Sequence, residues 1–451
     1  MKQPVALITL AAACSAIALM VFHGPGPARA QTVPPAPPPT NPAPQGPAPT
    51  PSAPKATAPQ PLPPVPPRAN ADAAIRQVLD VARSRFPRVP AMAAVVVRDG
   101  RIIGQAVSGV RKAGDPTPAT ERDLFHLGTC TKAITATLIG VLIDEGTLRW
   151  DSTIMEVLGR DVPEIHASLA SVTVDQLLHH RGGFLPRGPK EVWEKAQRAK
   201  GSDAEQRAAY VNDMLALQPA KTPGEYQYSN VGYAVLGRMA EVAAGVPFED
   251  LMQQKVLKPL GITTAVFGQP GDPRVVDQPW PHSSGKPIFR DNPACLNPSA
   301  RLAMSMEDWA KFAIFHLGHQ PTPPLLKPAT FDALHTVPES LPADQMGYAC
   351  GWFRPLRPWS NGRALHHVGG NALTYCAIWL FPRDDMGVLV ATNEGTSIAG
   401  DATDLVSGSL LLAFRGVEPR PLDSARPREK DWPGIEDRER RRKQAETSQT
   451  P

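Results

Sequence analysis

Proline limits how much of this chain can fold. The sequence of 451 residues contains 52 prolines, and 17 of them lie within the 40 positions from 31 to 70. Proline fixes φ and has no N–H group, so such a segment favours extended polyproline II structure over helix or sheet. We predict a semi-rigid Pro/Ala-rich linker at 31–69, which either spaces the folded part from a membrane or wall or is a leader without function.

The first thirty residues have the pattern of an export signal. Lys2 precedes an apolar run from Pro4 to Phe22, and Ala28 and Ala30 follow a helix-breaking stretch. This order is typical of a cleaved signal peptide at 1–30 and predicts a periplasmic or secreted protein. The alternative is an uncleaved anchor, because about 18 apolar residues suffice to span a bilayer, and only then would the protein be bound to a membrane.

The remaining composition predicts one globular domain followed by a charged tail. Lys and Arg number 47 against 43 Asp and Glu, a net charge of +4, and 42% of residues are hydrophobic. This balance argues against nucleic acid as a partner and allows a sizeable core. Residues 418–451 combine nine basic with eight acidic residues and few apolar ones, so we predict disorder there. The globular domain is then 70–417.

Apolar periodicity predicts strands and helices at both ends of this domain. A helix capped by Asn70 or Asp72 precedes a hairpin with strands at 93–97 and 102–103, and a buried helix follows at about 128–145. Strands at 374–381 and 387–392 and a helix at 401–414 close the domain.

The middle of the domain, about 150–300, is predicted to be mainly helical. Thr173-x-x-Gln176 and Ser305-x-x-Asp308 have the pattern of capping boxes. The domain would then consist of an α/β part, about 70–150 and 300–417, and a helical part inserted between.

Thr129 and Lys132 form the first group of residues with catalytic potential. They follow Gly128 at the predicted start of the buried helix and, three residues apart, share one face. The positive end of a helix favours a developing alkoxide, and a buried amine has a lowered pKa and accepts protons. The alternative is a capping threonine with a surface lysine.

Tyr228 and Asn230 form the second group, in a Gly- and Pro-containing loop before a helix at 231–244. A tyrosine hydroxyl beside a lysine relays protons, and an asparagine amide holds a substrate carbonyl. The alternative is an ordinary capping asparagine beside a packed tyrosine.

The third group is His367, Gly369 and Gly370, before the strand near Thr374. Glycines there let a substrate lie close to the strand edge. His366 and His367 are a poor metal site, because no other His, Asp or Glu cluster has ligand spacing, and His316-x-x-His319 is predicted to lie on a helix surface.

In this order the three groups resemble the beta-lactamase and penicillin-binding-protein superfamily, in particular its class C-like branch of esterases and D-amino-acid peptidases. That family carries Ser-x-x-Lys, Tyr-x-Asn and Lys/His-x-Gly, matched here by 129–132, 228–230 and 367–369. The resemblance covers about 90–415. It implies an α/β (α+β) fold in which a mixed, mostly antiparallel sheet flanked by helices stands beside an all-helical subdomain, with the site between them.

The resemblance also implies an acyl hydrolase for small-molecule esters, amides or peptides, including beta-lactam-like amides or cell-wall peptides. Thr129 would attack a carbonyl to form a covalent ester, and Lys132 and Tyr228 would share the role of base. The implied substrate-binding residues are Asn230, His367, Gly369 and Gly370. Backbone N–H groups of Thr129 and Gly370 would form the oxyanion hole. Neither a metal nor an organic cofactor is implied.

One departure from the family pattern leaves two functions open. The family nucleophile is serine, and the extra methyl of Thr129 restricts χ1 and crowds the approach of a carbonyl. Cys130 is a poor replacement because its helical angle turns it away from Lys132. The chain is therefore either an acyl hydrolase that uses Thr129 or an inactive relative that binds peptides or cell-wall fragments.

Two further features carry weaker expectations. Histidine rather than lysine at position 367 favours esters or peptides over the carboxylate of a beta-lactam. Pairing among Cys295, Cys350 and Cys376 stays open, since an exported domain permits disulfides.

Overall fold

The structure is a computed structural model that describes residues 62–338, 347–355 and 364–415. The predicted signal peptide at 1–30, most of the linker at 31–69 and the tail at 418–451 lie outside these residues. Within the described part of the chain, no helix combines the length and the apolar character needed to cross a bilayer.

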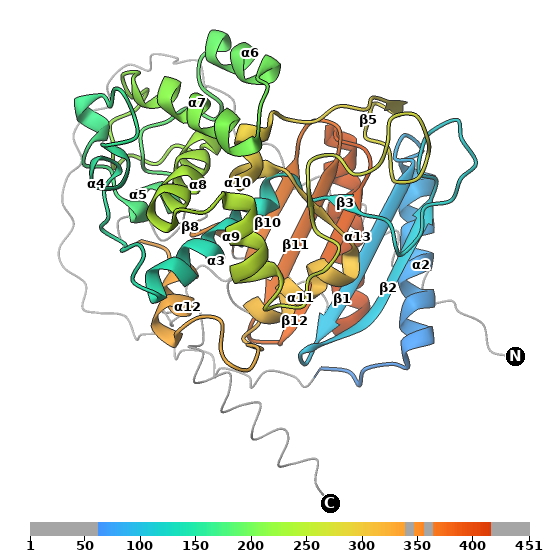
Figure 1. The fold of residues 1–451 in the computed structure, drawn as a ribbon. Helices are drawn as coiled ribbons and strands as arrows, with labels where there is room; N and C mark the ends of the chain where they lie inside the picture. The colour runs from blue at the N-terminus through green and yellow to red at the C-terminus, as the bar shows by residue number, and fades with distance from the viewer. Residues whose placement is uncertain (1–61, 339–346, 356–363, 416–451) are drawn as a thin grey trace, which may run out of the picture. The chain divides into compact units, whose positions relative to one another are not determined.

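A seven-stranded sheet forms the α/β part, in the order β2-β1-β12-β11-β10-β9-β8 (Figure 1). Every pairing among its described strands is antiparallel, where a mixed, mostly antiparallel sheet was expected. The strands are β1 (Ala91–Arg98), β2 (Arg101–Gly109), β8 (Gly347–Ala349), β9 (Trp352–Arg354), β10 (Leu365–Gly370), β11 (Tyr375–Phe381) and β12 (Met386–Thr392). The predicted hairpin and the two predicted C-terminal strands are confirmed as β1–β2 and β11–β12.

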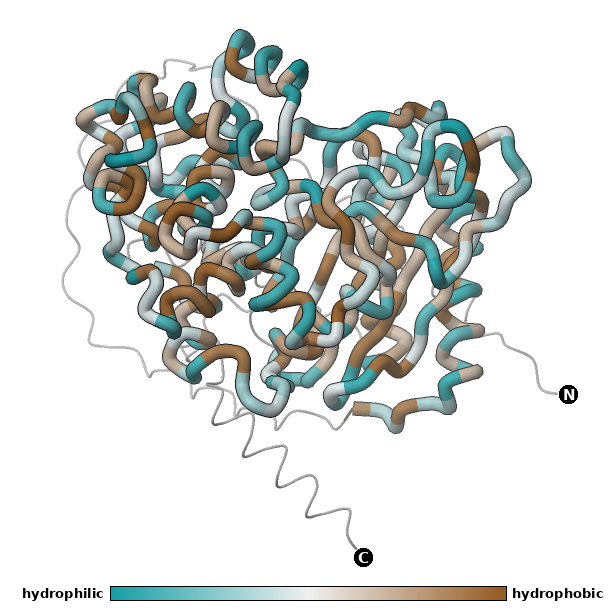
Figure 2. Tube along the Cα trace, viewed as in Figure 1, coloured by the Kyte–Doolittle hydropathy of each residue, from teal (hydrophilic) through white to brown (hydrophobic). Residues whose placement is uncertain are grey.

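Helices cover both faces of the sheet, so its central strands are buried on both sides. Alternate residues of β1 belong to the apolar clusters on opposite faces of the sheet. Val95 packs with the cluster that contains α3 (Thr131–Asp144) and α11 (Met306–His316). Val96 packs with α2 (Arg68–Arg85) and α13 (Ser397–Arg415). Successive side chains of a strand point to opposite faces, which explains why β1 is apolar throughout. Figure 2 shows hydrophobic residues along the strands and the helices against them.

The first helix and the two capping boxes differ in part from expectation. Helix α2 begins at Arg68 with Pro67 at its N-cap, so neither Asn70 nor Asp72 caps it, and it reaches into the predicted linker. The Thr173 capping box is confirmed. Ser305 Oγ accepts from the Asp308 N–H, which is one half of the box. The other half, a bond from the Ser305 N–H to the Asp308 carboxylate, is not formed, because that carboxylate accepts from two N–H groups of the loop at 263–264.

The middle of the domain is mainly helical, as predicted. Its helices are α4 (Ile154–Leu158), α5 (Val174–Leu178), α6 (Lys190–Arg198), α7 (Asp203–Leu215), α8 (Asn230–Ala244), α9 (Phe248–Met252) with a π-helical turn at Gln253–Leu257, and α10 (Asn297–Ala300). Helix α12 (Pro328–Leu334) packs on α3. Short 3₁₀ turns lie at Gly128–Cys130, Ala167–Leu169 and Ala294–Leu296.

Two small sheets join the helical and the α/β parts. The first has three strands, β3 (Phe125–His126), β7 (Leu302–Met304) and β4 (Val266–Phe267), and the second is a hairpin of β5 (His282–Ser283) and β6 (Lys286–Pro287). Strand β3 leads directly into the turn that carries Thr129, so this sheet fixes where that turn begins.

A buried cation holds three of the middle helices together. Arg207 of α7 has a fully buried side chain and forms ion pairs with Glu241 of α8 and Glu249 of α9, the latter at 2.9 Å. Charges removed from water require partners, because the loss of one partner leaves the other buried and uncompensated.

We predict that Arg207→Ala lowers the free energy of unfolding by about 3–5 kcal/mol, since it leaves two carboxylates without their cation. Urea denaturation measures this change. The control is Arg149→Ala, which removes an arginine paired with Asp151 and Glu156 but 58% exposed, and which should leave stability unchanged. Equal effects of the two substitutions would contradict the prediction.

Candidate active site

Thr129 lies in the 3₁₀ turn Gly128–Cys130, so the predicted continuous helix begins as α3 only at Thr131. The turn is pressed against β10: a Cβ at Gly128, where φ is +48°, would lie 2.4 Å from the Gly370 nitrogen. Thr129 is partly exposed, and its Oγ1 donates to the Val368 carbonyl at 2.9 Å. The nucleophile candidate therefore sits between the start of α3 and the end of β10.

Lys132 is fully buried one turn further along α3. Its Nζ donates to Asn230 Oδ1 at 2.6 Å and to the Ser299 carbonyl at 3.1 Å. Burial lowers the pKa of this amine well below its usual value, against a smaller opposing effect of Cys130. An amine with a lowered pKa can be neutral near neutral pH and accept a proton.

The Tyr228 loop is placed by the N-terminus of α8. Ser229, not Asn230, caps this helix, accepting from the Gly232 N–H at 3.3 Å. Asn230 is thereby free to bind Lys132, which rules out the interpretation of Asn230 as an ordinary cap. The ring centroid of Tyr228 is 4.9 Å from Lys132 Nζ. Burial raises the pKa of Tyr228, against a smaller lowering by the nearby Thr129 side chain, so it remains a neutral phenol.

His367 lies on β10, with its ring centroid 6.3 Å from that of Tyr228. Its side chain is buried, and Nδ1 donates to the Val368 carbonyl at 2.6 Å. Burial, with a further contribution from Lys132, lowers the pKa of His367 well below its usual value. The strand therefore presents a neutral imidazole where the family pattern also allows a charged lysine.

Gly369 and Gly370 bring the end of β10 close to the nucleophile turn. A Cβ at Gly369 would lie 1.9 Å from the Leu127 carbonyl oxygen, which only glycine avoids. All seven residues singled out from the sequence thus come from the Thr129 turn, α3, the Tyr228 loop, the start of α8 and β10, which meet at one place.

His180 is a residue of this site that the sequence did not single out. It adopts a left-handed backbone conformation with φ of 58°, and its Nδ1 accepts from the Ser229 N–H at 3.2 Å. Its ring centroid lies 4.3 Å from that of Tyr228, and burial lowers the pKa of the imidazole. The stretch 177–183 that contains His179 and His180 resembles the family in sequence, but nothing local to it indicates that His180 contacts Tyr228.

The four cysteines among the described residues are buried in the core. Cys130 Sγ lies 3.6 Å from both the His367 carbonyl and Cys376 Sγ, and burial raises the pKa of its thiol. Cys295, Cys350 and Cys376, whose pairing the sequence left open, are free in the structure, as is Cys130.

One expectation about histidines is wrong. His316 was expected on a helix surface, but it is fully buried, 2.7 Å from His335 and 3.1 Å from Thr137 Oγ1. Its partners come from α12 and α3, which sequence spacing does not reveal. Within the described ranges, no group of three or more His, Cys, Asp or Glu residues could hold a metal ion.

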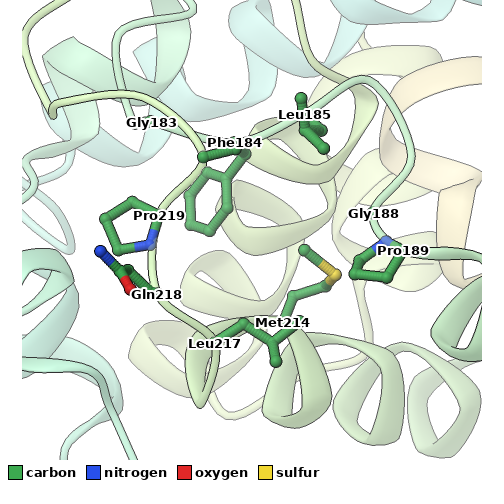
Figure 3. A pocket seen from close by; sticks show the side chains of 10 residues that line it. Gly183, Phe184, Leu185, Gly188, Pro189, Met214, Leu217, Gln218 and Pro219 are labelled. Atoms are coloured by element: carbon green, nitrogen blue, oxygen red, sulfur yellow. The ribbon is translucent and has the colours of Figure 1, made fainter.

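An apolar pocket of about 60 Å³ lies beside the Tyr228 loop (Figure 3). Phe184, Met214 and Leu217 are among its lining residues, and none of the lining side chains is titratable. The carbonyl of Leu185, another lining residue, accepts from Ser229 Oγ at 2.7 Å. The pocket wall therefore contacts the Tyr228 loop but supplies no acid–base group.

The family comparison agrees with this geometry. The sequence profile of the family described as Beta-lactamase matches residues 71–411. The chain belongs to the beta-lactamase family. The resemblance seen in the sequence is thus confirmed, and the family consists of hydrolases that include beta-lactamases, esterases and carboxypeptidases.

Individual beta-lactamase family relatives are distant. Penicillin-binding protein 4 of Amycolatopsis lactamdurans is 26% identical over 370 residues, 75% of this chain and 91% of the relative. Esterase EstB of Burkholderia gladioli is 30% identical over 210 residues, 44% of this chain and 51% of the esterase. A solved structure described as a class C beta-lactamase has a TM-score of 0.64 at 18% identity and covers 78% of this chain and 98% of its own. The predicted fold class is confirmed.

We predict that Gly369→Ala lowers the melting temperature by several degrees, because the new Cβ forces β10 away from Leu127 at a cost of about 1–3 kcal/mol. The matched control is Gly408→Ala in α13, where a Cβ meets open space and should stabilise the helix by about 0.5–1 kcal/mol. Calorimetry of both variants measures the difference. An unchanged melting temperature for Gly369→Ala would show that the turn and the strand are not in this contact.

Proposed function

We propose that this protein is an acyl hydrolase that acts through a covalent ester on Thr129. The observation that carries the proposal is the buried Lys132 amine, which donates to Asn230 Oδ1 and to the Ser299 carbonyl. An amine of lowered pKa on the helix that follows the Thr129 turn is suited to be a base.

The proposed reaction has two steps. Lys132 accepts the Thr129 proton, with Tyr228 near the hydroxyl, and Thr129 Oγ1 bonds to the substrate carbonyl carbon. The N–H groups of Thr129 and Gly370 hold the resulting oxyanion until the leaving alcohol or amine departs with the proton from Lys132. Water then attacks the ester on Thr129 in the same way and releases the acid.

The neutral His367 supports uncharged esters, or peptides, as substrates in preference to beta-lactam-like amides with a carboxylate. A neutral imidazole supplies no charge to attract a carboxylate, whereas lysine would. That Esterase EstB and Penicillin-binding protein 4 are relatives is consistent with either an ester or a peptide substrate. Cell-wall peptides remain within this substrate class.

We further propose that the protein acts in the periplasm or outside the cell, after removal of 1–30. The Pro/Ala-rich segment at 31–69 would act as a spacer, shortened at its end by the start of α2 at Arg68. This proposal rests on the sequence pattern of an export signal.

One contact favours the alternative, a binding protein without turnover. Thr129 Oγ1 donates its hydrogen to Val368 rather than to Lys132, and the γ-methyl restricts the rotation needed to change partners. The nucleophile experiment separates the two functions.

Thr129→Ser keeps the attacking oxygen and removes only the methyl, so hydrolysis of a p-nitrophenyl ester should rise or stay equal. Thr129→Ala should abolish hydrolysis and labelling by a fluorescent acylating probe. Cys130→Ala serves as the control and should be nearly as active as the wild type, since Cys130 faces the core.

A wild type without turnover would favour the binding protein, even if Thr129→Ser gained activity. Activity that survives Thr129→Ala but disappears in Cys130→Ala would overturn the assignment of the nucleophile.

The lowered pKa of Lys132 predicts a pH dependence of activity and stability. Activity should rise with pH through that pKa, because the neutral amine is the base. Between that pKa and about 10.4, the unfolded chain binds one proton more than the folded chain, so stability also rises with pH in this window. His180 and His367, whose pKa values are lowered, stay neutral there.

Lys132→Met removes the titrating amine but keeps its bulk, so it should be inactive and should lose this part of the stability increase. Rate profiles and melting temperatures between pH 6 and 10 test both effects. A stability curve of the same slope in the variant would contradict a lowered pKa.

A further inference from the structure

A buried polar cluster behind the Thr129 turn is not used by the proposed reaction. Its centre is Asp291, in the loop before the 3₁₀ turn Ala294–Leu296, with a side chain only 7% exposed. Burial would raise the pKa of this carboxyl, but His126 and Arg301 lower it to about 2. The group is therefore an anion at neutral pH, and Arg301 Nε lies 3.2 Å from Oδ2.

One arm of the cluster runs to the nucleophile turn. His126 Nδ1 accepts from the Gly128 N–H at 3.0 Å, so its hydrogen is on Nε2, which donates to Asp291 Oδ2 at 3.2 Å. The orientation of this imidazole is set by Asp291. The imidazole in turn holds the backbone one residue before Thr129.

The other arm runs to the turn after β10. Asn371 Nδ2 donates to Asp291 Oδ1 at 3.1 Å. The Oδ1 of Asn371 accepts from the N–H groups of Leu373 and Thr374 at 3.0 and 2.9 Å. Asp291 thereby holds the backbone one residue after Gly370.

We propose that Asp291 is a positioning residue that sets the separation of the two N–H groups of the oxyanion hole, those of Thr129 and Gly370. This inference rests on the proposed function. The two groups belong to segments of different sheets, since β3 is part of the three-stranded sheet and β10 of the seven-stranded one. No backbone pairing between β3 and β10 fixes the distance between these two N–H groups. Asp291 is linked to the first segment through His126 and to the second through Asn371.

Asp291→Asn tests the proposal because it removes the charge and places a donor against His126 or Asn371. A displacement of about 1 Å in a catalytic group costs on the order of 100-fold in rate. We expect kcat for the p-nitrophenyl ester to fall about 10- to 100-fold, with KM changed less than about twofold. Affinity for an aryl boronic acid, which forms a tetrahedral adduct on a hydroxyl nucleophile, should fall in parallel.

The matched control is Asp308→Asn. Asp308 is also buried, and it accepts from the N–H groups of Thr263 and Thr264 at 2.8 and 2.7 Å, away from the Thr129 turn. This variant should lower the melting temperature and leave kcat and boronate affinity unchanged. Equal kcat losses in both variants, or a rise in KM with constant kcat for Asp291→Asn, would overturn the positioning role.

Hydrogen–deuterium exchange gives a test that does not depend on turnover. Asp291→Asn should speed exchange at the amides of Gly128 and Thr374, and Asp308→Asn should speed it only at Thr263 and Thr264. Unchanged exchange at Gly128 and Thr374 overturns the inference about Asp291. A wild type that neither hydrolyses the ester nor binds the boronate overturns the proposed function instead, while the exchange result still decides whether Asp291 holds both loops.

Discussion

The burial of one amine organises the domain. Lys132 Nζ lies away from water and is satisfied by Asn230 at the start of α8 and by the Ser299 carbonyl in α10. A buried polar group without partners is costly, so these three segments, separated by about 100 and 70 residues in the sequence, must meet before the amine can be accommodated. The helical part and the α/β part are therefore not independent, because the α/β part carries the amine and the helical part supplies both of its partners.

A second constraint is the absence of side chains where the Thr129 turn meets β10. Gly128 and Gly369 allow backbone atoms of the two segments to approach to distances that a Cβ would prevent. With the two segments this close, Thr129 Oγ1 donates to the Val368 carbonyl and Cys130 Sγ lies 3.6 Å from Cys376 Sγ. The direction in which Thr129 and Cys130 face is thus decided by backbone packing as much as by helical angle.

The sequence predicted helices and strands better than it predicted which residues contact each other. The hairpin β1–β2 and the helical middle follow from local periodicity. The three groups of site residues were singled out by residue type and spacing, and the family resemblance gave them their expected roles. Local pattern could not decide between a capping and a functional Asn230. Ser229 caps α8 in its place, and Asn230 binds Lys132, which lies 98 residues away in the sequence. The burial of His316 against His335 and the link of His126 to Asp291, 165 residues apart, depend on tertiary contacts that have no signature in a single segment.

The first and last described helices, α2 and α13, pack together on one face of the sheet, whereas α3 and the Thr129 turn lie on the other (Figure 1). Both ends of the described domain are thus formed by helices on the opposite face of the sheet from the Thr129 turn. A solid support, a reporter protein or a second enzyme joined at Arg68 or at Arg415 would attach behind the sheet. The fold is accordingly suited to immobilisation through either end, with the Thr129 turn on the opposite face of the sheet from the point of attachment.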